Sequence, residues 1–361
     1  MSRIYIEGFE AGGIQPPVWN PFTIGQTAGT TPPTIVATPA AGNVSKGEKC
    51  LRVKTGGGDY AWFNVGHFGE FNGIYMKMRY YHPNTWYQHT LFRFWSERME
   101  LISYLFWIST GQFRYYGDVN YSGIISTPNT TDWHVIELWL KTSTAGANTD
   151  GEIELRVDGV PHIANYAART NQLDYFAKIN KIQFGGGSYS TYAYYDDLII
   201  DSTSTLNVNR NSSVVGYELT SDSTKNWSPV PTSANNYSNI TFTGNTDEQD
   251  ADSIDGDYIS ADSTGVKDIY TVAQDFSPGI DSSSSVKCMQ LQVRGRRHGP
   301  CPAVYLRPFV ELNSSEYSGN IIQPPYTNFQ TRYSLWEQNP DSSVDWTVDD
   351  LDNMKVGVES T

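Results

Sequence analysis

Aromatic side chains, with polar residues such as Arg93 among them, gather in one stretch of the sequence, between residues 86 and 116. Exposed tryptophan and tyrosine rings stack on the apolar face of a sugar ring, and polar side chains beside them bind its hydroxyl groups. The stretch therefore predicts a glycan-binding surface, although part of these rings must fill the core, since each strand buries one face. The candidate glycan-binding residues are Trp86, Tyr87, Arg93, Trp95, Tyr104, Trp107, Tyr115 and Tyr116.

Two glutamates have a spacing that suits the hydrolysis of glycosidic bonds. Glu152 and Glu154 share one face of an expected strand, and retaining glycosidases place two carboxyl groups about 5–5.5 Å apart. The alternation of these glutamates with Ile153, Leu155 and Val157 favours an ordinary strand whose glutamates face solvent. We therefore expect no catalytic residues and a protein that is not an enzyme.

A dense basic cluster and an acidic run are the other candidate sites. Arg294, Arg296 and Arg297 predict a docking patch for an acidic partner, and a solvated hairpin tip explains them equally well. The acidic run at 247–257 has Ile254 where a calcium loop needs an acid, and no glutamate closes it. A solvated loop is favoured there, so no metal site and no cofactor is expected. A calcium site is left open as an alternative, both at this run and at Asp196 and Asp197.

The composition excludes several partner classes. Lys and Arg total 25 against 39 Asp and Glu, which gives a net charge of −14. Nucleic acids and anionic membranes attract cationic surfaces, so neither is an expected partner. No apolar run approaches the ~20 residues of a membrane span. The N-terminal residues predict a strand rather than a signal peptide, and Cys50, Cys288 and Cys301 are too sparse for a disulfide framework, with a Cys288–Cys301 bridge left open.

The elements that must position these side chains are short strands. β-branched and aromatic runs alternate with glycine, proline, serine and asparagine, a pattern typical of all-β sandwiches. In residues 133–141, Ile136, Leu138 and Leu140 fall on one side, which is expected to face the core. The dipeptide 158–159, Asp-Gly, predicts a hairpin turn, and Thr347 is placed to cap a short helical turn.

The same pattern divides the chain. Residues 202–213 are polar and short-sided, as in a linker. We predict an all-β protein of two β-sandwich (jelly-roll) domains, at 1–201 and 214–361, joined by this short polar linker.

Residues 1–201 resemble the concanavalin-like (laminin-G-like) jelly roll. The features that carry the resemblance are the opening strand at 4–10, Asp132-Trp133-His134 before an apolar strand, the hairpin at 155–159 and the closing strand at 195–200. The fold includes glucanases with an E-x-D-x-x-E strand. Here residues 152–157 have Glu for the middle Asp and Val157 in place of the last acid, so the acid–base residue is missing.

Residues 214–361 resemble a module of tailed-phage virion proteins. The matching pieces are Asn226-Trp227, residues 257–260, residues 267–270, Asn339-Pro340 and residues 345–347. The two resemblances together imply a non-enzymatic component of the virion surface, in a head decoration or a tail fibre. Expected partners are other virion proteins, further copies of the chain and cell-surface glycans. The alternative is a glycan-cleaving hydrolase or lyase with an accessory β-module.

Overall fold

The computed structural model describes only part of the chain, in many short ranges. The described residues are 3–7, 24–26, 34–39, 49–56, 59–83, 89–98, 100–108, 112–117, 120–126, 132–145, 148–173, 175–185, 191–203, 206, 211–212, 214, 216–230, 258–261, 263–274, 284–297, 305–324 and 330–361. They form two compact units, one from the residues up to 214 and one from the residues after it. The acidic run 247–257 and Cys301 lie outside the described residues.

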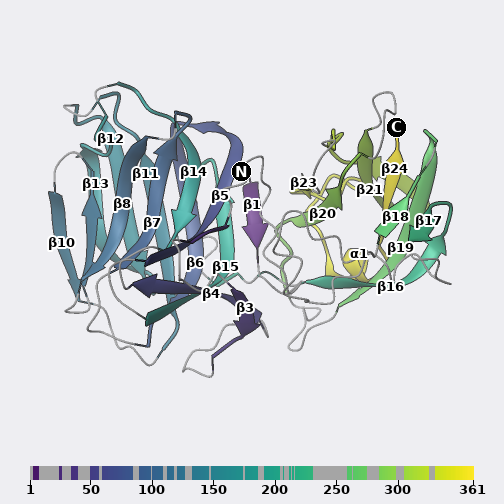
Figure 1. Ribbon diagram of the computed structural model, residues 1–361, viewed down its shortest axis with the longest axis horizontal. Helices are drawn as coiled ribbons and strands as arrows, with labels where there is room; N and C mark the ends of the chain where they lie inside the picture. Colours follow the sequence, from purple (N-terminus) through teal and green to yellow (C-terminus); the bar gives the residue numbers. More distant parts are fainter. Residues whose placement is uncertain are drawn as a thin grey trace. The chain divides into compact units, whose positions relative to one another are not determined.

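The first unit consists of two antiparallel sheets (Figure 1, purple to teal). The first sheet contains β1 (Arg3–Glu7), β3 (Thr34–Ala37), β4 (Lys49–Gly56), β6 (Gly73–Tyr81), β11 (His134–Lys141), β12 (Gly151–Val157), β13 (Val160–Ala168) and β15 (Thr191–Asp201). The second sheet contains β2 (Ile24–Gln26), β5 (Asp59–Phe71), β7 (His89–Ser96), β8 (Leu101–Ile108), β9 (Gln112–Tyr116), β10 (Asn120–Ser126) and β14 (Ile179–Phe184).

Each sheet brings together strands that are far apart in the sequence. The first runs in the order β4-β15-β6-β11-β12-β13, with β3 beside β4 and β1 beside β15. The second runs in the order β10-β9-β8-β7-β14-β5, with β2 beside β5. Two residue pairs between β4 and β5 connect the sheets. Strand β14 is thereby placed between β5 and β7, which precede it by about a hundred residues.

The core of the first unit lies between the two sheets. Tyr80 and Tyr195 of the first sheet pack against the second sheet, with ring centroids 6.5 Å from Phe113 and 5.8 Å from Phe184, respectively. On β11 the side chains of Ile136, Leu138 and Leu140 are buried, which confirms the alternation predicted from the sequence. The all-β sandwich class is likewise confirmed.

Two local predictions are also confirmed. Asp158 and Gly159 have φ angles of 52° and 80° between β12 and β13, the positive values that a tight hairpin turn requires. Thr347 caps α1 (Val348–Asp352), because its hydroxyl accepts the backbone N–H of Asp350, whose carboxylate accepts the N–H of Thr347. No helix in the described part of the chain is long and apolar enough to cross a membrane.

The second unit is built from smaller sheets (Figure 1, green to yellow). Its main sheet has the order β16 (Tyr217–Thr224), β19 (Val266–Gln274), β24 (Lys355–Ser360), β21 (Leu306–Leu312) and β22 (Ser315–Ser318). Two further sheets have two strands each. One pairs β17 (Ser228–Val230) with β18 (Tyr258–Ser260), and the other pairs β20 (Met289–Gly295) with β23 (Gln330–Trp336). Trp336, Trp346 and Leu351 belong to its core, where the indole N–H of Trp346 donates to the carbonyl of Trp336 at 2.9 Å.

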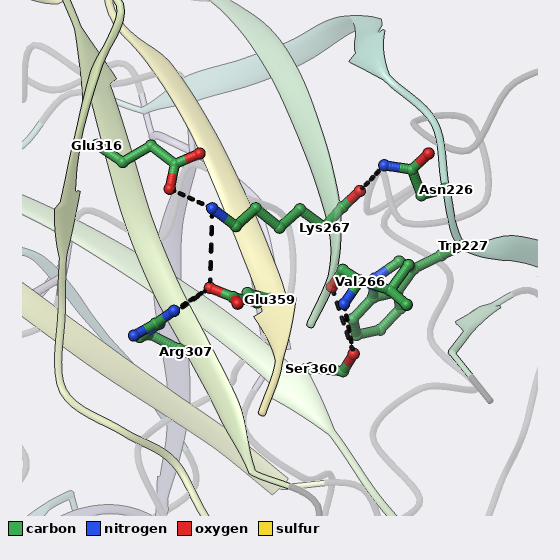
Figure 2. A network of polar contacts seen from close by, with 8 residues as sticks. All are labelled: Asn226, Trp227, Val266, Lys267, Arg307, Glu316, Glu359 and Ser360. Carbon is green, nitrogen blue, oxygen red and sulfur yellow. Dashed lines mark hydrogen bonds and ion pairs between the residues drawn. The ribbon is translucent and has the colours of Figure 1, made fainter. Parts of the chain in front are cut away.

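A row of alternating charges crosses the main sheet of this unit. Figure 2 shows Lys267 of β19 between the carboxylates of Glu316 and Glu359, and Arg307 of β21 on the other side of Glu359. The guanidinium Nε of Arg307 donates to Glu359 at 3.0 Å. With two acids and two bases, this charged row is neutral overall.

The buried hydroxyl of Tyr217 makes the stability of the second unit depend on pH in the alkaline range. This hydroxyl has no hydrogen-bond partner among the described residues. Burial, and after it the charge of Asp352, raises the pKa of Tyr217 to about 12. The folded state therefore keeps a proton that the unfolded chain loses above pH ~10, so this contribution to stability is lost as the pH rises through about 12.

We expect Tyr217→Phe to reduce this alkaline loss of stability but not to abolish it, because burial also raises the pKa of Tyr333 to about 12. At pH 7 the variant removes an unpaired buried hydroxyl, so its free energy of unfolding is unchanged or raised by up to about 1 kcal/mol. Urea unfolding of the full chain at pH 7 and pH 11, followed by the fluorescence of its tryptophans, measures both effects. An alkaline loss equal to that of the wild type would show that Tyr217 does not cause it.

Candidate functional site

The outer face of the second sheet brings most of the described candidate residues together. Residues that are paired in the register of adjacent strands point to the same side of a sheet. Tyr116 of β9 pairs with Tyr104 of β8, Tyr104 pairs with Arg93 of β7, and Arg93 pairs with Gln183 of β14. The four side chains therefore form one continuous row across four strands.

Alternation along each strand adds a second residue beside each member of this row. The eight side chains are half-buried, except for the more deeply buried Lys181 and Gln183. We call them the aromatic–basic face: Arg93, Trp95, Tyr104, Phe106, Arg114, Tyr116, Lys181 and Gln183.

Strand phase decides which rings belong to this face. On β7, Phe92 and Phe94 are fully buried, whereas the alternate residues Arg93 and Trp95 point outward. The same alternation corrects the prediction for Tyr115, which is fully buried and points into the sandwich, where its hydroxyl donates to the carbonyl of Thr170 at 3.2 Å. Consecutive tyrosines of a strand cannot share a face, so Tyr115 is a core residue.

Three aromatic rings of the face hold one another in place. Tyr104 and Tyr116 stack with ring centroids 4.6 Å apart and planes inclined by 11°. Phe106 meets both rings edge-on, at 6.5 Å from Tyr104 and 6.2 Å from Tyr116. Burial, and after it the neighbouring Tyr116, raises the pKa of Tyr104. The hydroxyl of Tyr104 is thus neutral at pH 7 and can donate a hydrogen bond as well as accept one.

The cations of the face are oriented by neutral neighbours. The guanidinium of Arg93 donates to the side-chain oxygens of Gln183 and Thr90, at 3.3 Å each. Arg114 donates to the hydroxyl of Tyr116 at 3.5 Å, and its buried Nε has no hydrogen-bond partner among the described residues. These contacts orient the two guanidinium groups on the face.

Lys181 and Trp95 make a further pair. The ammonium nitrogen of Lys181 lies 5.3 Å from the ring centroid of Trp95, within the range of a cation–π contact. Burial lowers the pKa of Lys181. The indole nitrogen of Trp95 is buried, and no partner for it occurs in the part of the chain that the structure describes.

Several candidates stay untested. Trp86 and Tyr87 lie outside the described residues, as do the side chains of Trp107 and Arg294, although both of the latter lie on described strands. Arg296 and Arg297 are half-buried, and Nε of Arg297 donates to the carbonyl of Pro324 at 2.9 Å. The docking patch therefore stays a prediction.

The two glutamates of β12 are engaged with cations. Glu152 accepts the ammonium of Lys141 at 2.7 Å and the indole N–H of Trp139 at 3.0 Å, and these bonds lower its pKa. Glu154 is not exposed to solvent as predicted but nearly buried, and it accepts Nε of Arg156 at 2.6 Å. A general acid needs a raised pKa, so Glu152 does not suit that role.

The carboxylates considered for calcium have other partners. Asp197 accepts Nε of Arg79 at 2.8 Å and the backbone N–H of Val214 at 2.7 Å, and Asp196 accepts the N–H of Asp197. Among the described residues, no group of three or more His, Cys, Asp or Glu side chains could hold a metal ion.

Sequence reasoning missed four members of the aromatic–basic face: Phe106, Arg114, Lys181 and Gln183. No local pattern in the sequence places Lys181 and Gln183 of β14 beside β7. A usable signal was present, because β7, β8, β9, β10 and β14 contain no Asp or Glu in a strongly acidic chain.

The first unit is thus a two-sheet β-sandwich with an aromatic and cationic outer face. No protein-family model and no curated protein matches the chain. Among solved structures, alginate lyase Aly36B is similar at 16% identity over 42% of this chain and 80% of that one, with a TM-score of 0.32. Domain 4 of the arabinanase AbnA from Geobacillus stearothermophilus, in complex with arabinotriose, covers 55% of this chain and 92% of its own at 12% identity, with a TM-score of 0.36.

The comparisons correct one prediction. A Trypanosoma rangeli sialidase mutant displaying trans-sialidase activity matches 54% of this chain and 34% of its own at 13% identity, with a TM-score of 0.32. The fold-level neighbours thus include alginate lyases and sialidases, so the expectation of a non-enzymatic protein is wrong. At these identities the likeness concerns the all-β fold alone, and it does not bear on a phage origin.

Proposed function

We propose that the first unit binds a glycan chain across the aromatic–basic face. The observation that carries the proposal is the row Tyr116–Tyr104–Arg93–Gln183, which sets ring edges, hydroxyls, a guanidinium and an amide side by side on four strands. Sugars present both C–H surfaces and hydroxyl groups, so their recognition needs apolar and polar groups close together.

The rigidity of the face supports binding. Tyr104, Tyr116 and Phe106 restrain one another, and Gln183 and Thr90 orient Arg93. Side chains that are already ordered lose little conformational entropy when a ligand binds, which favours even a weakly interacting ligand. A glycan lying across the strands meets a new side chain at each strand spacing of about 4.8 Å.

The test is binding of the full chain to an array of neutral and acidic polysaccharides, followed by calorimetry on the ligands found. We expect Tyr104→Ala to weaken the affinity for the glycan at least tenfold, about 1.4 kcal/mol. The substitution removes the ring of Tyr104 and leaves the ring of Tyr116 without its stacking partner. Tyr104→Phe keeps the ring and loses only the hydroxyl, so a smaller loss is expected. Release of reducing ends in the same samples reports cleavage.

The matched control is Tyr192→Ala on β15. This half-buried tyrosine lies on the first sheet, under the guanidinium of Arg52 at 4.7 Å, away from the aromatic–basic face. The control is expected to retain wild-type affinity. Binding that Tyr192→Ala and Tyr104→Ala reduce equally, or no binding to any glycan, would refute the proposed site.

A place on the surface of a tailed-phage virion is the biological context that we propose. It rests on the sequence pattern of residues 214–361 alone, and on no observation of the fold. A weak glycan site repeated over many copies on a particle would gain avidity through effective concentration. Cosedimentation of the purified chain with particles that lack it tests this context independently of glycan binding.

A further inference from the structure

We infer that the glycan bound by the aromatic–basic face is acidic, with carboxylate groups along its chain that pair with Arg93, Arg114 and Lys181. This inference rests on the proposed function and names its ligand class. It starts from the distribution of charge, which the aromatic residues alone do not explain.

The strands that carry the face have no negative charge of their own. Strands β7, β8, β9, β10 and β14 contain no Asp or Glu, although the chain has 39 acidic residues against 25 Lys and Arg. Glu97 and Glu100 are exposed beyond the ends of β7 and β8, and exposed Glu70 near the end of β5 pairs with Lys178 at 3.3 Å. The positive charge of the face is thus concentrated on its central strands.

Several basic residues elsewhere in the described structure pair with carboxylates. Lys141 pairs with Glu152 at 2.7 Å, and Lys355 pairs with Glu311 at 2.8 Å. The charged row of the second unit is neutral overall, with Glu359 between Lys267 and Arg307 (Figure 2). On the aromatic–basic face, Arg93 donates to an amide and a hydroxyl, and Arg114 donates to a phenol. Three basic side chains on strands that contain no Asp or Glu give this face the charge to attract a polyanion.

The three basic side chains of the face are spaced along the direction in which a polysaccharide would cross the strands. Arg114 lies on β9, Arg93 two strands away on β7, and Lys181 on the next strand, β14. With strands about 4.8 Å apart, the three charges span about 14 Å across the sheet. A polysaccharide that crosses the strands can bring a carboxylate to each cation while its rings contact Tyr104, Tyr116 and Trp95. Arginine suits this pairing because its planar fork binds a carboxylate with two hydrogen bonds.

The experiment compares polyuronates with the same polymers after their carboxyl groups are reduced to primary alcohols. The probes are polygalacturonate, polyglucuronate and polymannuronate, each measured by calorimetry with the full chain at two salt concentrations. At least one polyuronate is expected to bind, with affinity that falls at least tenfold on carboxyl reduction and also falls with added salt. Arg93→Gln and Arg114→Gln are each expected to lower its affinity about tenfold.

Arg98→Gln is the matched control, because it removes the same charge from the exposed turn between β7 and β8, where Arg98 lies over the ring of Tyr175. It is expected to keep wild-type affinity, and circular dichroism checks that every variant is folded. Equal binding of reduced and native polymers, or binding of neutral glycans only, would overturn this inference and leave the glycan-binding function standing. Binding to no polymer, neutral or acidic, would overturn both.

Discussion

We expect Asp197→Ala to lower the free energy of unfolding of the first unit by about 3–5 kcal/mol, because the change leaves buried positive charge without its carboxylate. Asp197 is 1% exposed, and it accepts Nε of Arg79 at 2.8 Å. Its other carboxylate oxygen accepts the N–H of Val214, so one side chain joins a strand of the first sheet to the segment that follows β15.

Lys77 makes this loss larger. Its ammonium group is fully buried, 3.7 Å from the carboxylate of Asp197, and donates to the carbonyls of Asp197 and Ser212. Burial lowers the pKa of Lys77, and the charge of Asp197 is the largest effect that opposes this. Without Asp197, the charged form of Lys77 is disfavoured further, and the contacts with Ser212 and Val214 weaken together.

The variant Asp197→Asn separates the effect of losing the negative charge from the effect of backbone strain at this position. Asp197 has a positive φ of 51°, which Asn tolerates better than Ala, so the Asn variant loses mainly the charge. It is expected to be destabilised, but less than Asp197→Ala. Urea unfolding with hydrogen-exchange mass spectrometry assigns the loss to a unit, and Asp197 variants should leave exchange in β19 and β24 unchanged. Wild-type stability of Asp197→Ala would contradict the role given to this carboxylate.

The second large effect is expected at Asp268 on β19. This buried carboxylate accepts the backbone N–H groups of Asn226 and Trp227 at 2.6 and 2.7 Å, and the hydroxyl of Tyr270 at 2.9 Å. An unpaired buried donor costs about 1–3 kcal/mol. Asp268→Ala leaves three donors without this acceptor and is therefore expected to destabilise the second unit by at least about 3 kcal/mol.

The turn at residues 226–227 depends on this carboxylate. Figure 2 shows the neighbouring contacts, in which the indole N–H of Trp227 donates to the carbonyl of Val266 at 3.1 Å and the amide of Asn226 donates to that of Lys267 at 2.8 Å. Loss of Asp268 is therefore expected to expose Trp227, which is 8% exposed in the structure. A red shift of tryptophan fluorescence in the folded variant measures this change.

Two variants distinguish the parts of this network. Asp268→Asn keeps one oxygen for the backbone donors, so about half of the loss is expected. Tyr270→Phe removes only the hydroxyl and is expected to cost about 1 kcal/mol. If Asp268→Ala lowers the free energy of unfolding no more than Tyr270→Phe does, the hydrogen bonds of Asp268 to the backbone contribute little to stability.

Features set by neighbouring residues follow from the sequence by itself. The period of two buries Ile136, Leu138 and Leu140, and the Asp158-Gly159 pair supplies the positive φ angles of a hairpin. Thr347 and Asp350 close the capping box of α1 within one turn. These features depend on dihedral preferences and contacts over a few residues, which hold wherever the segment lies in the fold.

Only the tertiary structure decides how distant strands are aligned. Arg93 and Gln183 are 90 residues apart in the chain, and Lys181 reaches Trp95 only because β14 inserts between β5 and β7. The aromatic-rich stretch places rings on β7, β8 and β9, but it cannot separate Tyr116 from the buried Tyr115 without the phase of β9. That phase and the register between strands are set by packing the two sheets against each other, a property of the whole unit that no local pattern contains.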